Sequence, residues 1–471
     1  MLRQQLIVIV ALAALAPAAR ADKPVPIVLV NANAAGIGLN DPTPVAPVGG
    51  NPMTTLGGQR MFALQHAANI IWPQLRSSVP IRIQVSFDSR ACNATGAVLA
   101  SAGAAWADAN FKRATIPDTW YHGALANKMA RTDLATTTDE AVAIFNINLG
   151  QANCLAGSPF YYGLDGNEGT GVDLVATALH EFSHGLGFSQ FGNVSTGTLL
   201  LNMQDTYNRN LLDTSTGLTW PQMTNTQRIA AAVNFDHVVW AGANVTQAVP
   251  TRLALGLPVL NIQSPAGIAG PYAVGTAQFG PPLTASGVSA DIVIATDLAE
   301  TGSPTTTDAC SPITNAVDVA GKIALVDRGA CTFIIKVKNA QVAGAIAVLV
   351  ADNVAGGPPP GLGGIDPTIT IPSARITLAA GNAIKTALQT EPVAGALVLD
   401  MTRRAGADPS GFALMNAPNP VVPGSSISHW DPIASPNLLE EPAINPDLEH
   451  GLDLNYQLFL DIGWRDEDTR P

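Results

Sequence analysis

Two histidines and a glutamate stand close together in the pattern HEFSH at residues 180–184. Residues four apart on a helix project from the same face, so His180 and His184 can bind one metal ion while Glu181 lies beside it. Zinc lowers the pKa of a water that it binds toward neutrality, and a carboxylate can take the proton as that water attacks a peptide carbonyl. The pattern predicts zinc-dependent hydrolysis, with Glu181 as general base and later proton donor.

The pattern falls within a predicted helix. Asp173 favours a helix start, and Gly185 and Gly187 are expected to end the helix. The apolar residues that would form its surface are Val172, Leu174, Val175, Ala178, Leu179 and Phe182. The alternative is an ordinary amphipathic helix whose histidines are hydrogen-bonded core residues. The two glycines and the signs of export described below favour the metal site.

A third ligand is expected, because catalytic zinc sites usually use three protein ligands and leave a position for water. The remaining histidines are His66, His122, His237, His429 and His450. His429 stands out because it lies in the stretch SISHWD, just after a change in the composition of the chain. The others lie in a predicted helix or near turn residues, so we expect them to be hydrogen-bonded or solvated.

An export signal is predicted at the start of the chain. Arg3, the apolar run at residues 6–15 and the small residues around Ala21 match the parts of a secretory signal peptide, with cleavage after Ala21. A membrane anchor is the alternative, but the run is shorter than the roughly 20 apolar residues that a span needs. We therefore expect a secreted or periplasmic protein without stable membrane association.

Four cysteines in an exported chain suggest two disulfides. Their order favours Cys92 with Cys154 and Cys310 with Cys331, although order alone leaves the other pairings open. The chain has no CxxC pair, which argues against a zinc site built from cysteines. The net charge of −12, with 13% charged residues, gives no electrostatic reason to bind nucleic acid.

The elements before the HEFSH pattern predict an α+β catalytic domain. Strands are expected at residues 26–30, 81–87 and 141–149, and a helix at residues 59–72. Strands that precede an active-site helix suggest a cleft along a sheet edge. From about residue 255 the chain becomes rich in Val, Ala, Gly and Pro. Its short apolar runs, with a helix expected at 333–344, predict a small β-rich domain with a strand–helix–strand element.

Within this second region, the stretch GKIALVDRGACTF at residues 321–333 and the residues up to 345 resemble the protease-associated (PA) domain. The resemblance implies a non-catalytic domain that shapes substrate access or binds peptide segments. Asp327 and Arg328 could form a catalytic pair, but a role in a surface turn is the preferred interpretation.

A further resemblance involves the stretch HEFSHGLGF at residues 180–188 and the pair His429-Trp430. Together they resemble leishmanolysin-like metzincins, which carry HExxHxxGF, a long insertion and then a His-Trp pair. The resemblance implies that His429 is the third zinc ligand, because Gln190 occupies the position of the third histidine in the extended metzincin motif. The order of the motifs also resembles secreted bacterial peptidases with a PA domain inserted into the catalytic domain.

These resemblances imply an α+β fold: a metzincin-like catalytic domain, with a twisted sheet and an active-site helix, interrupted by a β-rich PA domain. The expected divisions are a signal peptide at 1–21, a first catalytic part at 22–254, the PA insertion at 255–402 and a second catalytic part at 403–471.

Glu440 departs from the metzincin pattern. Metzincins place a methionine in a tight turn beneath the metal, and here Glu440 stands at the expected position while no methionine follows Met415. That methionine packs against the site and is not a ligand, so its loss need not prevent zinc binding. A carboxylate there can add a ligand, block the open coordination position, or raise the pKa of the bound water.

Two functions are weighed. The first is a secreted zinc endopeptidase with one catalytic Zn²⁺ ion and protein or peptide substrates. The second is a catalytically silent scaffold that binds peptides or surface polymers through its PA domain. Glu440 favours this second function. The intact ligand set and Glu181 favour the enzyme, because a silent scaffold has no physical need for a buried carboxylate beside imidazoles.

Two further possibilities are weaker. Zinc and water also hydrolyse non-peptide bonds, but nothing in the sequence favours such a substrate beyond the shared chemistry. Asp205, Asp213 and Asp453 could take part in calcium binding, yet the chain has no Asp-rich loop of the EF-hand kind. Calcium therefore stays open.

Overall fold

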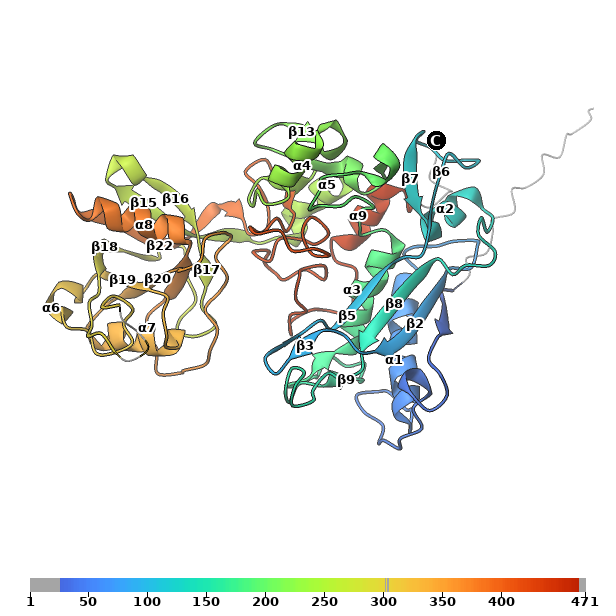
Figure 1. Ribbon diagram of the computed structural model, residues 1–471, viewed down its shortest axis with the longest axis horizontal. Coiled ribbons are helices and arrows are strands. Elements are labelled where there is room, and N and C mark those ends of the chain that lie inside the picture. Colours follow the sequence, from blue (N-terminus) through green and yellow to red (C-terminus); the bar gives the residue numbers. More distant parts are fainter. Residues whose placement is uncertain (1–25, 301, 303–304, 466–471) are drawn as a thin grey trace, which may run out of the picture.

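The computed structural model describes residues 26–300, 302 and 305–465, so the predicted signal peptide lies outside the described residues. Figure 1 shows two lobes. The inserted lobe consists of residues 255–404, and the major lobe contains the described residues on both sides of it. The fold is mixed α/β. No helix among the described residues is long and apolar enough to cross a membrane.

The central sheet of the major lobe has the strand order β1-β2-β8-β5. These strands are β1 (Val28–Asn31), β2 (Arg82–Asp88), β8 (Ala141–Asn146) and β5 (Ala100–Ala104). The strands β1, β2 and β8 are parallel, whereas β5 runs antiparallel to β8 at the edge. Alternate residues of β2 face the core, since Ile83, Val85 and Phe87 are all buried. The three strands predicted in this region are confirmed.

Two helices, α1 (Leu56–Ile71) and α3 (Leu174–Leu186), pack against each other, and α3 lies on β5 and β8. The helix predicted at residues 59–72 is α1, and the HEFSH pattern lies in the C-terminal half of α3. Because α3 is covered by α1 on one side and by the sheet on the other, all of its residues are buried. Such a helix can hold polar side chains only where they find partners.

A smaller antiparallel sheet joins the two chain segments of the major lobe. Its order is β13 (Leu218–Thr219), β12 (Leu211–Asp213), β14 (Val238–Trp240) and β23 (Ala413–Leu414). The last strand follows the insertion in the chain, yet it pairs with β14, which precedes it. The helix α5 (Ala243–Arg252) likewise packs on α9 (Asn455–Ile462). One hydrophobic core therefore contains residues from both segments.

The remaining elements of the major lobe are short. They are β3 (Cys92–Asn93), β4 (Gly96–Ala97), β6 (Ala107–Ala109), β7 (Thr119–His122), α2 (Gly123–Ala130), β9 (Phe160–Tyr161), β10 (Val172–Asp173), β11 (Gln204–Asp205) and α4 (Asn225–Ala231).

The inserted lobe is built on an eight-stranded mixed sheet with the order β16-β15-β22-β18-β19-β20-β21-β17. The strands are β15 (Leu255–Ser264), β16 (Gly270–Ala273), β17 (Gly275–Thr276), β18 (Val288–Ile294), β19 (Ile323–Asp327), β20 (Ala347–Ala351), β21 (Ser373–Ile376) and β22 (Val393–Arg404). Its helices are α6 (Ala316–Val319), α7 (Phe333–Val342) and α8 (Leu378–Ala387). The elements β19, α7 and β20 are the predicted strand–helix–strand element.

Both faces of this sheet are covered. Along β19, Ile323 and Leu325 belong to one hydrophobic cluster, while Ala324 and Val326 belong to a second one. Successive side chains of a strand point to opposite faces, so the two clusters lie on the two sides of the sheet. This explains why the strands read as continuous apolar runs rather than as an alternating pattern.

The inserted lobe leaves and rejoins the major lobe at neighbouring positions. The long strands β15 and β22 pair with each other, with Leu255 opposite Arg404. Directly below, the Ala405 N–H donates to the Ala254 carbonyl at 3.1 Å. The core cluster of the major lobe contains no residue of the inserted lobe. The insertion thus requires little rearrangement of the chain segments on either side of it.

We expect the major lobe to fold when residues 256–403 are replaced by a short Gly/Ser linker. The two ends are already hydrogen-bonded neighbours and the core of the major lobe is complete without the insertion. Cooperative thermal unfolding, followed by circular dichroism on the mature chain, checks this. The same linker in place of residues 225–252 is the control, since it removes Trp240 from the core and should abolish the transition. A shortened chain without a cooperative transition would contradict the expectation.

Candidate metal centre

The helix α3 is fixed at both of its ends. At the start, Asp173 Oδ1 accepts hydrogen bonds from the backbone N–H groups of Val175 (2.7 Å) and Ala176 (3.0 Å), which satisfies two N–H groups that would otherwise lack partners. At the end, Gly187 caps the helix with φ +134°, a conformation that L side chains rarely adopt. The predicted start at Asp173 and the predicted stop at Gly187 are confirmed.

Gly185 does not end the helix, contrary to expectation. It lies inside α3, where an added Cβ would stand 2.7 Å from the Ala141 Cβ of β8. The residue must be small because helix and sheet approach closely at this point. This packing holds the end of the helix that carries His184 against the central sheet.

The structure brings His429 next to the two histidines of α3. The Nε2 atoms of His180 and His184 are 3.2 Å apart. The His429 ring centroid lies 5.2 Å from that of His180 and 4.8 Å from that of His184. Among the described residues, one group of three or more potential ligands could hold a metal ion, and it consists of His180, His184, His429 and Glu440. Their ligand atoms all lie within 4.8 Å of one another.

Each of the three histidines is oriented by a backbone carbonyl. The Nδ1–carbonyl pairs are His180 with Leu439 (2.8 Å), His184 with Phe188 (2.8 Å) and His429 with Ser425 (2.9 Å). A carbonyl can only accept, so each Nδ1 carries the proton and each Nε2 of a neutral ring keeps its lone pair. Such outer hydrogen bonds are usual for metal-binding histidines. The three residues therefore fit a zinc ion.

Burial keeps these rings neutral. It lowers the pKa of His180 to about 3 and that of His184 to about 4, and it holds the pKa of His429 well below its ordinary value. Hydrogen bonds to the carbonyls oppose this shift without reversing it. Neutral imidazole is the form that binds a metal.

Glu181 is buried beside the histidines. Its Oε2 has no hydrogen-bond partner, and burial raises the pKa of the carboxyl to about 8, although Arg90 acts in the opposite direction. A cation held by the three imidazoles would favour the ionised form of this carboxyl. Its position suits a group that exchanges a proton with a reacting water.

Glu440 belongs to the same group. It is completely buried, and its Oε2 stands 3.4 Å from His184 Nε2 and 3.6 Å from His180 Nδ1. Burial raises the pKa of this carboxyl well above its ordinary value, and the nearby Glu181 raises it further. The ligand oxygen of Glu440 lies within 4.8 Å of the ligand atoms of all three histidines.

The histidines open onto a cleft of about 830 Å³. One wall comes from the edge strand β5 and the residues before it, and another wall comes from two loops of the second chain segment. The lining residues are Ala97 to Ala102, Leu155, Glu168, Gly171 to Asp173, Thr177, His180, Glu181, His184, Val422 to Ser425, His429 and Pro442 to Pro446. Three imidazoles, the Glu181 carboxylate and an edge strand thus share one cavity.

Both predicted disulfides are present, Cys92–Cys154 and Cys310–Cys331. The first ties the hairpin of β3 and β4 to the loop that carries Leu155, and both Leu155 and Ala97 line the cleft. It therefore fixes one wall of the cavity.

The other histidines stay outside the group. His122 is buried and its Nε2 lies 2.9 Å from Ser189 Oγ, whereas His237 is exposed. His66 and His450 contact each other edge to face, and His450 Nε2 lies 2.8 Å from Asp173 Oδ2. His450 is thus hydrogen-bonded and not a ligand, as expected, and its contact with Asp173 joins the second chain segment to the residue before α3.

Asp327 and Arg328 do not pair with each other. Asp327 contacts Lys385, and Arg328 Nη1 lies 3.0 Å from Asp352 Oδ1. Two separate ion pairs at the end of β19 agree with the preferred structural role over a catalytic one.

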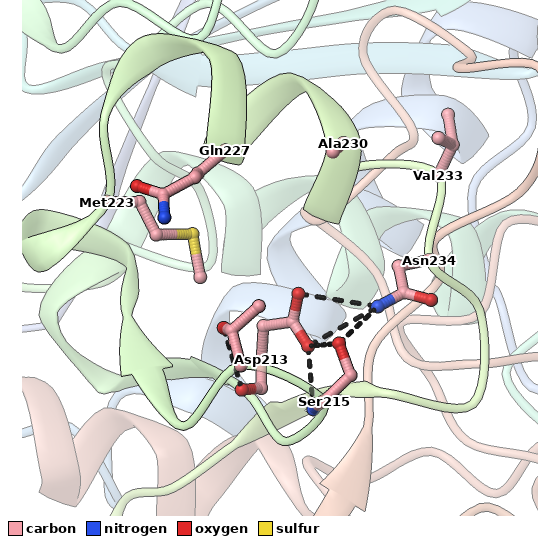
Figure 2. A pocket seen from close by; sticks show the side chains of 8 residues that line it. Asp213, Ser215, Met223, Gln227, Ala230, Val233 and Asn234 are labelled. Atoms are coloured by element: carbon pink, nitrogen blue, oxygen red, sulfur yellow. Dashed lines mark hydrogen bonds between the residues drawn. The ribbon is translucent and has the colours of Figure 1, made fainter.

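The three candidate calcium ligands lie in separate places. Figure 2 shows Asp213 in a second pocket, of about 300 Å³, where its carboxylate accepts hydrogen bonds from Ser215 and Asn234. Asp205 accepts from backbone groups of its own turn and of Phe191, and Asp453 accepts from the Leu439 N–H. Calcium binding stays untested.

Comparison with known proteins identifies one domain. Residues 288–384 match the PA domain family, which confirms the PA domain predicted in this region. A PRADC1-like protein of Drosophila melanogaster is 46% identical over 44 residues, which cover 9% of this chain and 22% of that protein. The chain thus spans less than a quarter of the length of this curated relative.

Solved structures show only partial likeness. A zinc aminopeptidase from Bacillus subtilis is 25% identical, with 34% of this chain and 37% of that chain covered and a TM-score of 0.22. An aminopeptidase from Aneurinibacillus sp. strain AM-1 is 22% identical (34% and 38% covered, TM-score 0.23), and a subtilisin-like protease from Pseudoalteromonas sp. AS-11 is 17% identical (37% of each chain, TM-score 0.24). Similarities of this limited extent say nothing about the fold of the major lobe.

The pair of His450 and Asp173 predicts a pH-dependent stability. His450 Nε2 donates a hydrogen bond to the Asp173 carboxylate, which raises the pKa of His450 above 6.5, so the pair stabilises the fold fully below about pH 6.5 and less as the pH rises through the raised pKa. Substitution His450→Gln should cost about 1 kcal/mol at about pH 5.5 and clearly less at about pH 9. Urea unfolding with chelator in every sample measures this. The exposed His237→Gln is the control, and an equal cost at both pH values would refute the assignment.

Proposed function

We propose that this chain is an exported zinc metallopeptidase of the metzincin type that cleaves internal peptide bonds. The observation that carries the proposal is the convergence of three neutral imidazoles, each oriented by a backbone carbonyl, beside a buried carboxylate in an open cleft. His180, His184 and His429 hold the ion, and a coordination position that faces the cleft stays open. This is the ligand set that the sequence predicts.

A zinc ion bound there would act as a Lewis acid that activates water for attack on a peptide carbonyl. Glu181 takes the proton of the attacking water and passes it to the leaving amine. The burial that raises its pKa makes it a strong base for that step, while the charge of the ion keeps it ionised.

The edge strand β5 supports action on extended peptides. It pairs with β8 on one side, and its residues line the cleft. The free edge of a strand can add an extended peptide through main-chain hydrogen bonds. A substrate bound in this way presents a bond in the interior of its chain to the histidines, which favours an endopeptidase over an exopeptidase.

The disulfides and the predicted signal peptide support export of the chain. Disulfides form and persist in oxidising compartments, and this chain contains two. The predicted signal peptide at residues 1–21 would direct the chain there. The PA domain, as a second folded unit beside the cleft-bearing lobe, would shape access of protein substrates or bind peptide segments.

A second candidate function is a catalytically silent scaffold that binds peptides or surface polymers. Glu440 is the observation that favours it, because a buried carboxylate beside the ion would add negative charge and raise the pKa of the bound water. The intact Glu181 favours the enzyme.

The metal content of the purified mature chain tests the centre. We expect about one zinc ion per chain in the parent, and a loss or strong weakening of binding in His429→Ala, because three histidine ligands become two. Elemental analysis after gel filtration measures this. His237→Ala removes an exposed histidine and is the matched control. A parent without zinc, or full zinc content in His429→Ala, would be incompatible with the proposed ligand set.

Glu181→Gln tests the reaction. The substitution removes the proton acceptor but keeps the shape of the side chain, so kcat on casein should fall about 10²- to 10⁴-fold while zinc content stays unchanged. Glu391→Gln, which changes an exposed carboxylate of the inserted lobe that does not line the cleft, is the control. Equal activity of parent and Glu181→Gln would refute the role of Glu181. A zinc-loaded parent that does not cleave casein or gelatin, with or without chelator, would instead favour the silent scaffold.

A further inference from the structure

We propose that Glu440 is a fourth protein ligand of the metal ion, which it approaches from the buried side while the cleft side stays open. The proposal rests on the metal centre of the proposed function and adds a charged ligand to it. Metal sites with three histidines and one carboxylate differ from the three-ligand sites usual in zinc hydrolases. They also bring a negative charge into direct contact with the ion.

The position of the carboxylate carries the proposal. Glu440 Oε2 lies 3.4 Å from His184 Nε2, a separation suited to two ligands that share one ion at about 2.0–2.2 Å each. The other oxygen, Oε1, accepts a hydrogen bond from Asn455 Nδ2 at 3.3 Å. This bond leaves Oε2, buried and without a hydrogen-bond partner, next to the imidazoles.

The turn that carries Glu440 also positions the ligands. The Leu439 carbonyl accepts the Nδ1 proton of His180, and the Glu440 carbonyl accepts the N–H of Trp430, the neighbour of His429. The Leu439 N–H donates to Asp453. Backbone bonds on both sides of Glu440 therefore fix its side chain relative to the histidines.

The neighbouring Glu441 shows what a satisfied buried carboxylate looks like in this turn. Its Oε1 accepts from the Leu438 N–H at 2.8 Å, and its Oε2 accepts from Asn445 Nδ2 at 2.9 Å. Glu440 lacks such a partner on Oε2 although it is even more deeply buried. A buried carboxylate oxygen without a partner costs free energy, and a cation shared with the three imidazoles supplies the missing partner.

Glu440 does not compete with the substrate for space. His180, His184, His429 and Glu181 line the cleft, whereas Glu440 does not. A ligand from the buried side leaves the cleft side of the ion accessible, because zinc can accept a fifth ligand. The proposal is thus compatible with catalysis as well as with metal binding.

Two measurements on the full mature chain test the role of Glu440. The first is zinc affinity, from competition with a chromophoric chelator, for the parent, Glu440→Gln, Glu440→Met and the control Glu441→Gln. The second is the visible absorption spectrum of the Co²⁺-loaded proteins, which intensifies when the number of ligands falls. Circular dichroism of each variant confirms that it is folded.

We expect both Glu440 variants to bind zinc at least about tenfold more weakly than the parent, with stronger Co²⁺ absorption, while Glu441→Gln matches the parent in both. Folded Glu440 variants with the Co²⁺ spectrum and zinc affinity of the parent would overturn the role of Glu440 and leave the three-histidine centre intact. An equal loss in Glu441→Gln would also overturn it, since the effect would then come from the turn. A parent that binds neither ion would refute the metal centre itself and the role of Glu440 with it.

Discussion

The candidate metal centre depends on the hydrogen bond between His180 Nδ1 and the Leu439 carbonyl. The helix α3 by itself determines the backbone positions of the two histidines, but not the orientation of their rings. The ring of His184 is oriented locally by Phe188, two residues past the helix end, whereas the ring of His180 is oriented by a residue far along the chain. The site therefore exists only when the second chain segment is docked against α3.

Several contacts secure this docking. Asp461 of α9 accepts hydrogen bonds from the Trp240 indole and from the backbone and side chain of Asn244. The Trp430 indole donates to Asn455, and the aromatic rings of Phe188 and Trp430 meet edge to face. A shared core on this scale stabilises the lobe through apolar burial, while the polar pairs fix which residues face each other. Because all of these contacts lie within the major lobe, the chain can accommodate a large insertion between Ala254 and Ala405 without disturbing the histidines.

The sequence was sufficient for those features that depend on local spacing. A period of four residues places His180 and His184 on one face of a helix, and the apolar runs of the insertion predict its strands. The role of His429 required the resemblance to metzincins, since no local pattern links it to α3. Gly185 was misread as a helix stop because its packing against Ala141 is a tertiary contact. The contact between His450 and Asp173 was missed for the same reason.

Charge balance explains why a cation suits this polar core. The three imidazoles are neutral, since burial depresses their pKa values, while Glu181 and Glu440 are both buried and Glu181 raises the cost of ionising Glu440. Two carboxylates in one low-dielectric site cannot both ionise without a compensating charge. Arg90 acts on Glu181, but it is not among the causes that favour ionised Glu440. A divalent ion beside both carboxylates balances the two charges at once, and it also gives the Oε2 atoms of Glu181 and Glu440 the electrostatic partner that the protein does not provide. Glu440 would then share one compensating charge with Glu181, the proposed general base.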